Sequence, residues 1–199
     1  MRICVVALAS LAVMSCGHAP RVYMNRDLAT AAVLCPYNET PDADASWRMW
    51  KYVENEVRSK GYRLVPHDQV LAFYQKKKFL DADGKGESAQ IRMFTMKELA
   101  DEFKADAVVE SSLTDWGHST LLITNTVKVR LEARMYDKEE SILWQGEGEN
   151  SQTRSSSSWT GIIGNTIAGA TARFDDYAPR AANRCFESLP WAGYEPKPK

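Results

Sequence analysis

An aspartate-rich stretch comes closest to the pattern of a metal site. Asp81, Asp83 and Gly86 stand at positions one, three and six of a calcium loop, where carboxylates ligate the ion and glycine makes the sharp turn. Position five is Lys85, however, and position twelve is Arg92, where a carboxylate must clamp the ion. Two cations among the ligand positions argue against calcium, so we predict a solvated turn here.

The three histidines, His18, His67 and His118, stand far apart, and none has a partner at the spacing of a metal site. His118 follows a predicted buried strand, where a surface histidine in a turn between strands is the expectation. The motifs that mark a nucleophilic serine, such as GxSxG, are absent from the sequence. We therefore predict no cofactor, no metal and no enzymatic activity.

Small residues recur in the apolar segment 161–172. Its glycines resemble those of a phosphate-binding loop, but the lysine and the preceding strand of such a loop are missing. Small side chains at Gly161, Gly164, Ala168 and Gly169 permit another backbone to approach closely. The first interpretation is a helix packed on its own sheet. The alternative is an interface with another subunit or with the membrane surface.

Cys16 is the cysteine with the most specific predicted chemistry. The basic start Met1-Arg2 leads into an apolar run of about a dozen residues, which is too short to span a membrane and is typical of a signal peptide. The run ends in Val13-Met14-Ser15-Cys16-Gly17, which resembles the lipobox of bacterial lipoproteins, where the thiol is acylated, typically with palmitate. We predict a removed signal peptide at 1–15 and a lipid anchor on Cys16. An ordinary secretory signal is the alternative.

The residue after the cysteine bears on which membrane holds the anchor. Gly17 stands where, in lipoproteins of this kind, an aspartate would favour the inner membrane. The outer membrane, on its periplasmic side, is the predicted location, and the inner membrane and the cell surface are alternatives. Several acyl chains on one cysteine give a stable anchor where one chain is marginal. Residues 16–28 would then form a lipidated tether.

The composition is that of a globular protein, with 44% hydrophobic and 26% charged residues. The formal net charge of -1 leaves no electrostatic footprint for nucleic acid. A mature chain of about 184 residues is long enough for one sizeable core. Its remaining thiols are Cys35 and Cys185, and in an oxidising periplasm they form either a disulfide or two free buried thiols.

Hydrophobic periodicity places the elements that carry these residues. Strands are predicted at 30–35, 62–65, 107–109, 127–136 and 142–145, and helices from Ser46 to Lys60, around Val70 to Tyr74, from Thr95 and over 177–189. Ser46 is the predicted cap of the first helix, and Thr95 forms a capping box with Glu98. Most tryptophans are expected in the core, although Trp47, Trp50 and Trp159 could form an exposed patch.

The order of these elements predicts one α+β domain over residues 29–190, followed by a Pro-rich tail at 191–199. Its sheet is mixed, contains a long antiparallel hairpin and is flanked by helices. The strand at 127–136 alternates apolar and charged residues, which indicates one buried and one wet face.

Five short stretches occur in an order that resembles a family of bacterial lipoproteins of unassigned function, one member of which is a meningococcal lipoprotein antigen. They are PYNET at 36–40, GYRLVP at 61–66, ADAVV at 105–109, DWG at 115–117 and LWQG at 143–146. The resemblance covers nearly the whole mature chain. It implies a fold similar to the N-terminal domain of TolB, and a gene neighbour that encodes a lipoprotein of the CsgG type. The family has no established catalytic residues to carry over.

Two function classes follow from the resemblance and the predicted anchor. In the first, the protein is a non-enzymatic accessory in the assembly or secretion of a surface structure, beside a CsgG-like lipoprotein, with a homo-oligomer as a further possible association. In the second, it is a cell-wall recognition module that activates a peptidoglycan synthase. Such activators need a long tether to cross the periplasm, and the predicted tether is short, which favours the first class.

Overall fold

The computed structural model describes residues 28–81, 86–121, 124–155 and 174–193. The strands are β1 (Thr30–Val33), β2 (Tyr37–Asn38), β3 (Arg63–Leu64), β4 (Ala107–Leu121), β5 (Thr124–Asp137) and β6 (Ile142–Ser155). The α-helices are α1 (Ala45–Ser59), α2 (His67–Lys76), α3 (Met96–Phe103) and α5 (Ala178–Phe186), and the short 3-10 helices are η1 (Ser88–Met93) and η2 (Phe174–Asp176).

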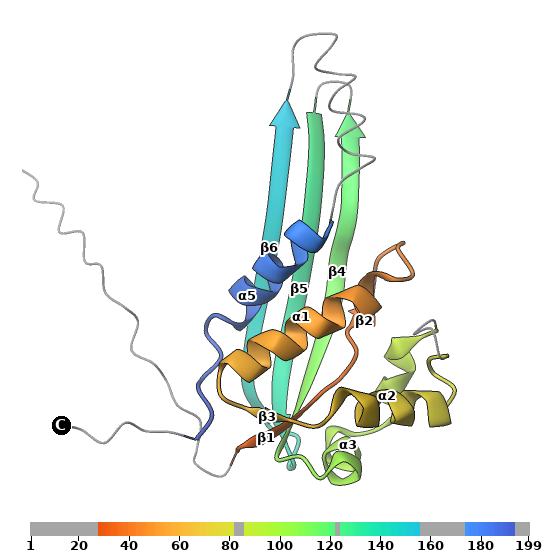
Figure 1. Ribbon diagram of the computed structural model, residues 1–199, viewed down its shortest axis with the longest axis vertical. Coiled ribbons are helices and arrows are strands. Elements are labelled where there is room, and N and C mark those ends of the chain that lie inside the picture. The colour runs from red at the N-terminus through yellow and green to blue at the C-terminus, as the bar shows by residue number, and fades with distance from the viewer. Residues whose placement is uncertain (1–27, 82–85, 122–123, 156–173, 194–199) are drawn as a thin grey trace, which may run out of the picture.

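The strands form one mixed sheet in the order β3-β1-β4-β5-β6, with β2 paired to β4 beside β1. Strand β1 runs parallel to β3 and β4, whereas β4, β5 and β6 are antiparallel to one another. These last three strands are 14 or 15 residues long and extend beyond the helices (Figure 1). The predicted mixed sheet with a long antiparallel hairpin flanked by helices is confirmed.

Alternation along β5 separates the two faces of the sheet. Its buried side chains are Val127, Val129, Leu131, Ala133 and Met135, none more than 6% exposed. Helices α1 and α5 lie across this inner face (Figure 1). The charged residues between these positions point to the opposite side, called the outer face below.

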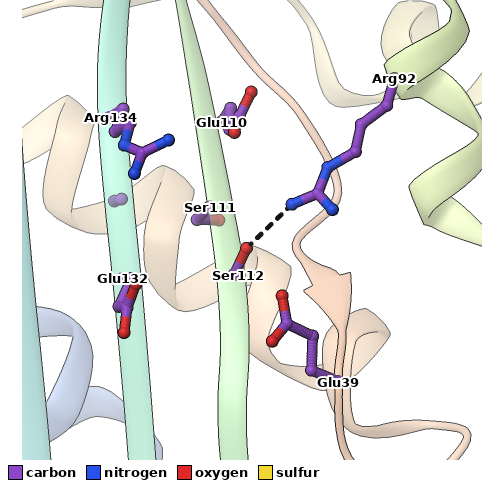
Figure 2. Close-up of a pocket in the computed structure, with 8 residues that line it drawn as sticks. Glu39, Arg92, Glu110, Ser111, Ser112, Glu132 and Arg134 are labelled. Carbon is purple, nitrogen blue, oxygen red and sulfur yellow. Dashed lines mark hydrogen bonds between the residues drawn. The ribbon is translucent and has the colours of Figure 1, made fainter.

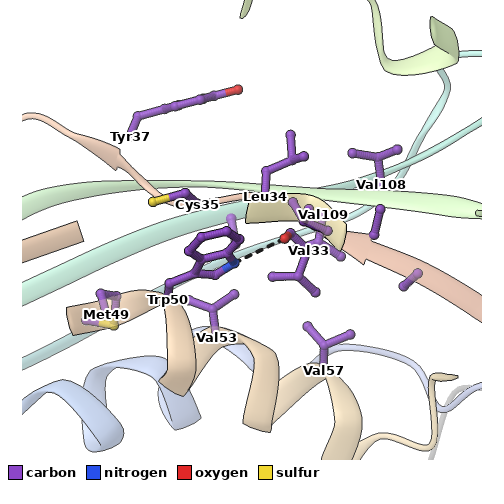
Figure 3. Packing of buried hydrophobic residues seen from close by; sticks show 14 of the residues in the cluster. Val33, Leu34, Cys35, Tyr37, Met49, Trp50, Val53, Val57, Val108 and Val109 are labelled. Carbon is purple, nitrogen blue, oxygen red and sulfur yellow. Dashed lines mark hydrogen bonds between the residues drawn. The ribbon is translucent and has the colours of Figure 1, made fainter. Parts of the chain in front are cut away.

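Helix α1 anchors the inner face to β1. The Trp50 indole Nε1 donates a hydrogen bond of 3.1 Å to the Val33 carbonyl, and Val53 and Val57 continue the contact one and two turns later (Figure 3). Leu34 lies on the other side of the strand and is also buried. Burial on both faces is typical of a parallel strand between two helical layers, and it explains the short run of purely apolar residues.

The second layer consists of α2, η1 and α3, held together by aromatic side chains. Phe73 of α2 lies 5.4 Å from the Phe94 ring and 5.3 Å from the Phe103 ring. The predicted capping box of α3 is present, because the Thr95 hydroxyl accepts from the Glu98 amide and the Glu98 carboxylate accepts from the Thr95 amide. This layer ends part-way along β4, so the outer face beyond it carries no helix among the described residues.

Helix α5 lies unusually close to β6. A Cβ atom added to Gly148 would lie 2.1 Å from the Ala181 carbonyl oxygen, and one added to Gly146 would lie 2.2 Å from the Cys185 carbonyl oxygen. Both distances are far below van der Waals contact, so glycine is required at both positions. Glycines thus permit a close approach of two backbones between α5 and β6, whereas segment 161–172, for which the sequence suggested such an approach, lies outside the described residues.

The start of the first helix differs from the prediction. The helix begins at Ala45 and has Asp44 at its N-cap, without a side-chain cap, whereas Ser46 lies inside the first turn and is only 7% exposed. Ser46 faces the core because an Asp42 turn, in which the Asp44 amide donates to Asp42 Oδ1, starts the helix earlier. Trp50 is 1% exposed and Trp47 packs against the core, so these two follow the expectation of core tryptophans and do not form the alternative exposed patch, while Trp159 lies outside the described residues.

Strands β4 and β6 are longer than predicted. The sequence indicated only 107–109 and 142–145, because polar residues without apolar alternation follow both segments. In β4 the register also shifts between Leu113 and Asp115, which interrupts the period of two. His118 therefore lies within β4, paired with Val127, and not in a turn between strands.

Candidate functional site

The outer face of β4, β5 and β6 carries charges in rows across the strands. Lys128 Nζ lies 3.0 Å from Asp115 on β4 and 3.1 Å from Glu149 on β6. Next to this row, Arg130 lies 2.7 Å from Glu147. Each of these pairs is diagonal, because the two residues stand two positions apart from direct opposition in the register of the sheet, and all are partly exposed. The positive and negative side chains neutralise one another, which explains how a solvent-exposed sheet face tolerates so many charges.

A depression of about 190 Å³ lies where the second helical layer ends and the bare outer face begins. We call it the ledge pocket, and its charged and hydroxyl-bearing residues are Glu39, Arg92, Glu110, Ser111, Ser112, Glu132 and Arg134. Figure 2 shows Arg92 on one side and Arg134 on the other, with Glu110 on β4 between them. The two arginines come from η1 and from β5, two segments that are distant in the sequence.

Arg92 is held in place at the ledge pocket by two contacts. Its guanidinium carbon lies 3.7 Å from the centre of the Tyr37 ring, and its Nη2 donates to the Ser112 hydroxyl at 3.3 Å. Tyr37 is fully buried, and its hydroxyl has no hydrogen-bond partner in the described part of the chain. Burial, with the Glu110 carboxylate second, raises the pKa of Tyr37, so the phenol stays neutral. Stacking fixes the guanidinium without neutralising it.

The ledge pocket was not predicted from the sequence, in which Arg92 stood out only as a residue that does not fit a calcium loop. The pairing of Glu110 with Arg134 could have been anticipated in part, because both residues occupy outward positions on neighbouring strands and are opposite each other in the register. The position of Arg92 opposite them depends on the path of η1, which no local pattern predicts.

One histidine-carboxylate pair lies between α1 and α2. The Nδ1 atom of His67 is 2.9 Å from Glu54 Oε1, and its ring lies 4.3 Å from the Trp50 ring. Glu54 is 9% exposed, so the pair is largely enclosed. The thiol in this region is Cys35, whose pKa burial raises to about 12, and the hydroxyls of Ser46 and Ser88 offset part of that rise. A protonated thiol is a poor nucleophile, and the contact of His67 with Glu54 links α2 to α1.

Of the two alternatives for Cys35 and Cys185, the structure has two free, buried thiols. Cys35 follows β1, whereas Cys185 lies on α5 against Gly146 and Gly148 of β6. Strands β4 and β5 separate β1 from β6, which amounts to about 14 Å at roughly 4.8 Å per strand. A disulfide needs Cα atoms within about 7 Å.

Several predicted sites lie outside the described residues. These are the lipidation site Cys16 and the small residues Gly161, Gly164, Ala168 and Gly169. They stay predictions. Within the described ranges, no three or more histidine, cysteine or acidic side chains are placed to hold a metal ion, and no helix is long and apolar enough to cross a membrane.

Comparison with known proteins gives the family. The profile described as "Putative lipoprotein GNA1162-like" matches residues 23–183, which is most of the chain. The chain belongs to this family. Its fold also matches the crystal structure of lipoprotein GNA1162 from Neisseria meningitidis, with a TM-score of 0.52 and 24% identity, over 74% of this chain and 99% of that one. The sequence resemblance to lipoproteins of the meningococcal antigen type is thereby confirmed.

Two further proteins are similar to this chain. A lipoprotein of Neisseria meningitidis serogroup B, NMB1124/NMB1162, is 24% identical over 141 residues, which cover 70% of this chain and 62% of that relative. The chain thus spans less than two thirds of that GNA1162-like relative. A PelC dodecamer from Paraburkholderia phytofirmans matches with a TM-score of 0.49 and 14% identity, over 86% of this chain and 96% of that one, and it supports no conclusion about this protein.

Proposed function

We propose that this protein is a lipid-anchored lipoprotein of the outer membrane, facing the periplasm, that works without catalysis. Its role would be that of an accessory in the assembly or secretion of a surface structure, in which it binds a CsgG-like envelope lipoprotein. Family membership supports the anchor, and the resemblance of the sequence supports the kind of partner. The structure contributes the surface that such a partner could cover.

That surface is the outer face of the distal sheet, which comprises the parts of β4, β5 and β6 beyond the helices. Its outward residues are Asp115, Gly117, Ser119, Thr126, Lys128, Arg130, Glu149, Ser151 and Thr153. Three features make it suited to docking. The side chains are short or paired, no described helix covers them, and β6 is an edge strand over 14 residues. Long bare edges and flat polar faces are ready templates for another protein chain.

The single observation that carries the proposal is Gly117. It is exposed in the middle of this face, and a Cβ added there would meet nothing within 4 Å. Glycine inside a strand weakens the strand and often marks a place where another backbone comes close. Nothing in the described fold occupies that space, which leaves room for the backbone of a bound partner.

The test is binding of the purified CsgG-like lipoprotein from the same organism to the full-length, detergent-solubilised protein and to its Gly117→Trp variant. The variant should fold normally, because the site is open, and should lose binding at least tenfold. Ala72→Trp, on the exposed side of α2, is the matched control and should bind like the unmodified protein. Equal binding by Gly117→Trp, or none by the unmodified protein, contradicts the proposal.

The anchor is tested separately by palmitate labelling in cells. The unmodified chain should take up label and Cys16→Ala should not. Label that persists in Cys16→Ala would contradict lipidation at this residue.

A further inference from the structure

The ledge pocket contains charges that the sheet leaves unpaired. Elsewhere on the outer face, Lys128 contacts carboxylates on both neighbouring strands, and Arg130 contacts Glu147 on β6 and Glu132 on its own strand. Among the described residues, Arg92 and Arg134 have no carboxylate within 4.0 Å, and Glu39 and Glu110 have no cationic partner within that distance. Two guanidiniums and the carboxylates of Glu39 and Glu110 thus face one depression without a direct ion pair between them, and the third carboxylate of the pocket, Glu132, lies 3.7 Å from Arg130.

The balance of charge selects the ligand. A simple anion would be attracted by the two guanidiniums but repelled by Glu39 and Glu110. A simple cation would be attracted by the two carboxylates but repelled by the two guanidiniums. At equal distance a carboxylate repels an anion as strongly as a guanidinium attracts it, so one unfavourable contact cancels one favourable contact. A ligand with both a carboxylate and an ammonium group satisfies both sets at once.

The size of the site also limits the ligand. A second depression of about 330 Å³ adjoins the first and shares Glu132, Ala133 and Arg134 with it, and it reaches β6 through Glu147. The two cross β4, β5 and β6, which is about 10 Å at roughly 4.8 Å per strand. An extended peptide rises about 3.3 Å per residue, so about three residues fit across the strands.

We propose that the ledge pocket binds short zwitterionic peptides of about three residues, with Arg92 and Arg134 holding carboxylates and Glu110 and Glu39 holding an ammonium group. Stacking on Tyr37 and the bond to Ser112 hold the Arg92 guanidinium ready before the ligand arrives, which lowers the entropic cost of binding. Two sources supply this chemistry in the cell envelope, namely the stem peptides of the cell wall and ordinary peptides released by proteolysis.

This inference goes beyond the proposed partner binding and uses a different part of the outer face. Gly117 is five residues beyond Ser112 along β4, which is about 16 Å at 3.3 Å per residue. The Gly117→Trp variant should therefore keep its affinity for peptides, and variants of the ledge pocket should keep their affinity for the partner lipoprotein. Failure of one proposal is thus distinguishable from failure of the other.

The experiment is isothermal titration of the full-length protein in detergent with two probes. One is the wall tripeptide L-alanyl-γ-D-glutamyl-meso-diaminopimelate, and the other is the tripeptide Ala-Glu-Lys made of L-residues. We expect saturable binding that weakens at high salt, because exposed charges are screened. Binding of the wall tripeptide alone would assign the site to the cell wall, whereas equal binding of both would assign it to peptides in general.

Two variants test the pocket itself. Arg134→Gln and Arg92→Gln should each weaken binding about five- to tenfold, since each removes one charge-assisted contact. Arg58→Gln, at an exposed position of α1, is the matched control and should bind unchanged. Acetylating the amines of the peptide, or amidating its carboxylates, should each abolish binding. No saturable binding of either probe, or undiminished binding by both pocket variants, overturns the proposal.

Discussion

Replacement of Gly148 by alanine tests the close contact of α5 with β6. The added Cβ would lie 2.1 Å from the Ala181 carbonyl oxygen and 2.3 Å from the Cys185 amide nitrogen. Real Cβ atoms stay at least 3.0 Å from such atoms, so the helix must move away by 3.0 − 2.1 = 0.9 Å or more. Backbone atoms make these contacts, so no side-chain rotation relieves them.

A shift of this size weakens the contacts that hold α5 in place. Gaps of 0.5 to 1 Å forfeit about a quarter to a half of the dispersion energy of each contact. The face of α5 that would lift consists of side chains at most 1% exposed, among them Phe186, which stacks on Trp144 at 5.1 Å between ring centres. Overpacking in a core typically costs 1 to 3 kcal/mol, so we expect the free energy of unfolding to fall by about 2 to 3 kcal/mol.

The matched control is the same substitution at Gly117, where the Cβ meets nothing within 4 Å. Alanine there should stabilise the strand by about 0.5 to 1 kcal/mol. Urea unfolding followed by tryptophan fluorescence measures both. At roughly 2 to 4 °C per kcal/mol for a chain of this size, the melting temperature of Gly148→Ala should fall by about 5 to 10 °C. Equal midpoints for Gly148→Ala and the unmodified protein would refute the close packing of α5.

Three further outcomes follow from the structure. Iodoacetamide should leave Cys35 and Cys185 unmodified in the native protein and should label both after unfolding without reductant, and an absence of label after unfolding would mean a disulfide. Because burial raises the pKa of each thiol from 9.0 to about 12, the unfolded chain ionises first, so the free energy of unfolding should fall as the pH rises from 9 to 12, by up to about 4 kcal/mol per thiol. A flat profile in that range would contradict their burial. Thr95→Ala should cost about 1 kcal/mol in urea unfolding and Thr95→Ser much less, whereas equal effects of the two would contradict the capping box.

Local patterns in the sequence determined the elements that rest on the core. The alternation along β5 reflects one buried and one solvent-exposed face. It predicted a strand over 127–136, and the observed strand is Thr124–Asp137. The capping box at Thr95 needs only residues three positions apart, and the predicted end of the first helix at Lys60 needs only the glycine that follows it, Gly61, whose φ is 88°. Such signals are readable because the interactions behind them are local or repeat at a fixed period.

Tertiary structure decided the rest. The distal part of β6 has no apolar period, because inward positions such as Gly148 and Asn150 are not apolar side chains, and in β4 a register shift interrupts the period, so only pairing with β5 shows that both are strands. The requirement for glycine at Gly148 comes from a helix about 30 residues later in the chain. The ledge pocket exists because the path of η1 brings Arg92 opposite Arg134, and the two thiols stay apart because β4 and β5 separate them. Contacts between segments that are distant in the sequence produce no periodic pattern, because the local preferences of each residue do not depend on which distant residue it will contact.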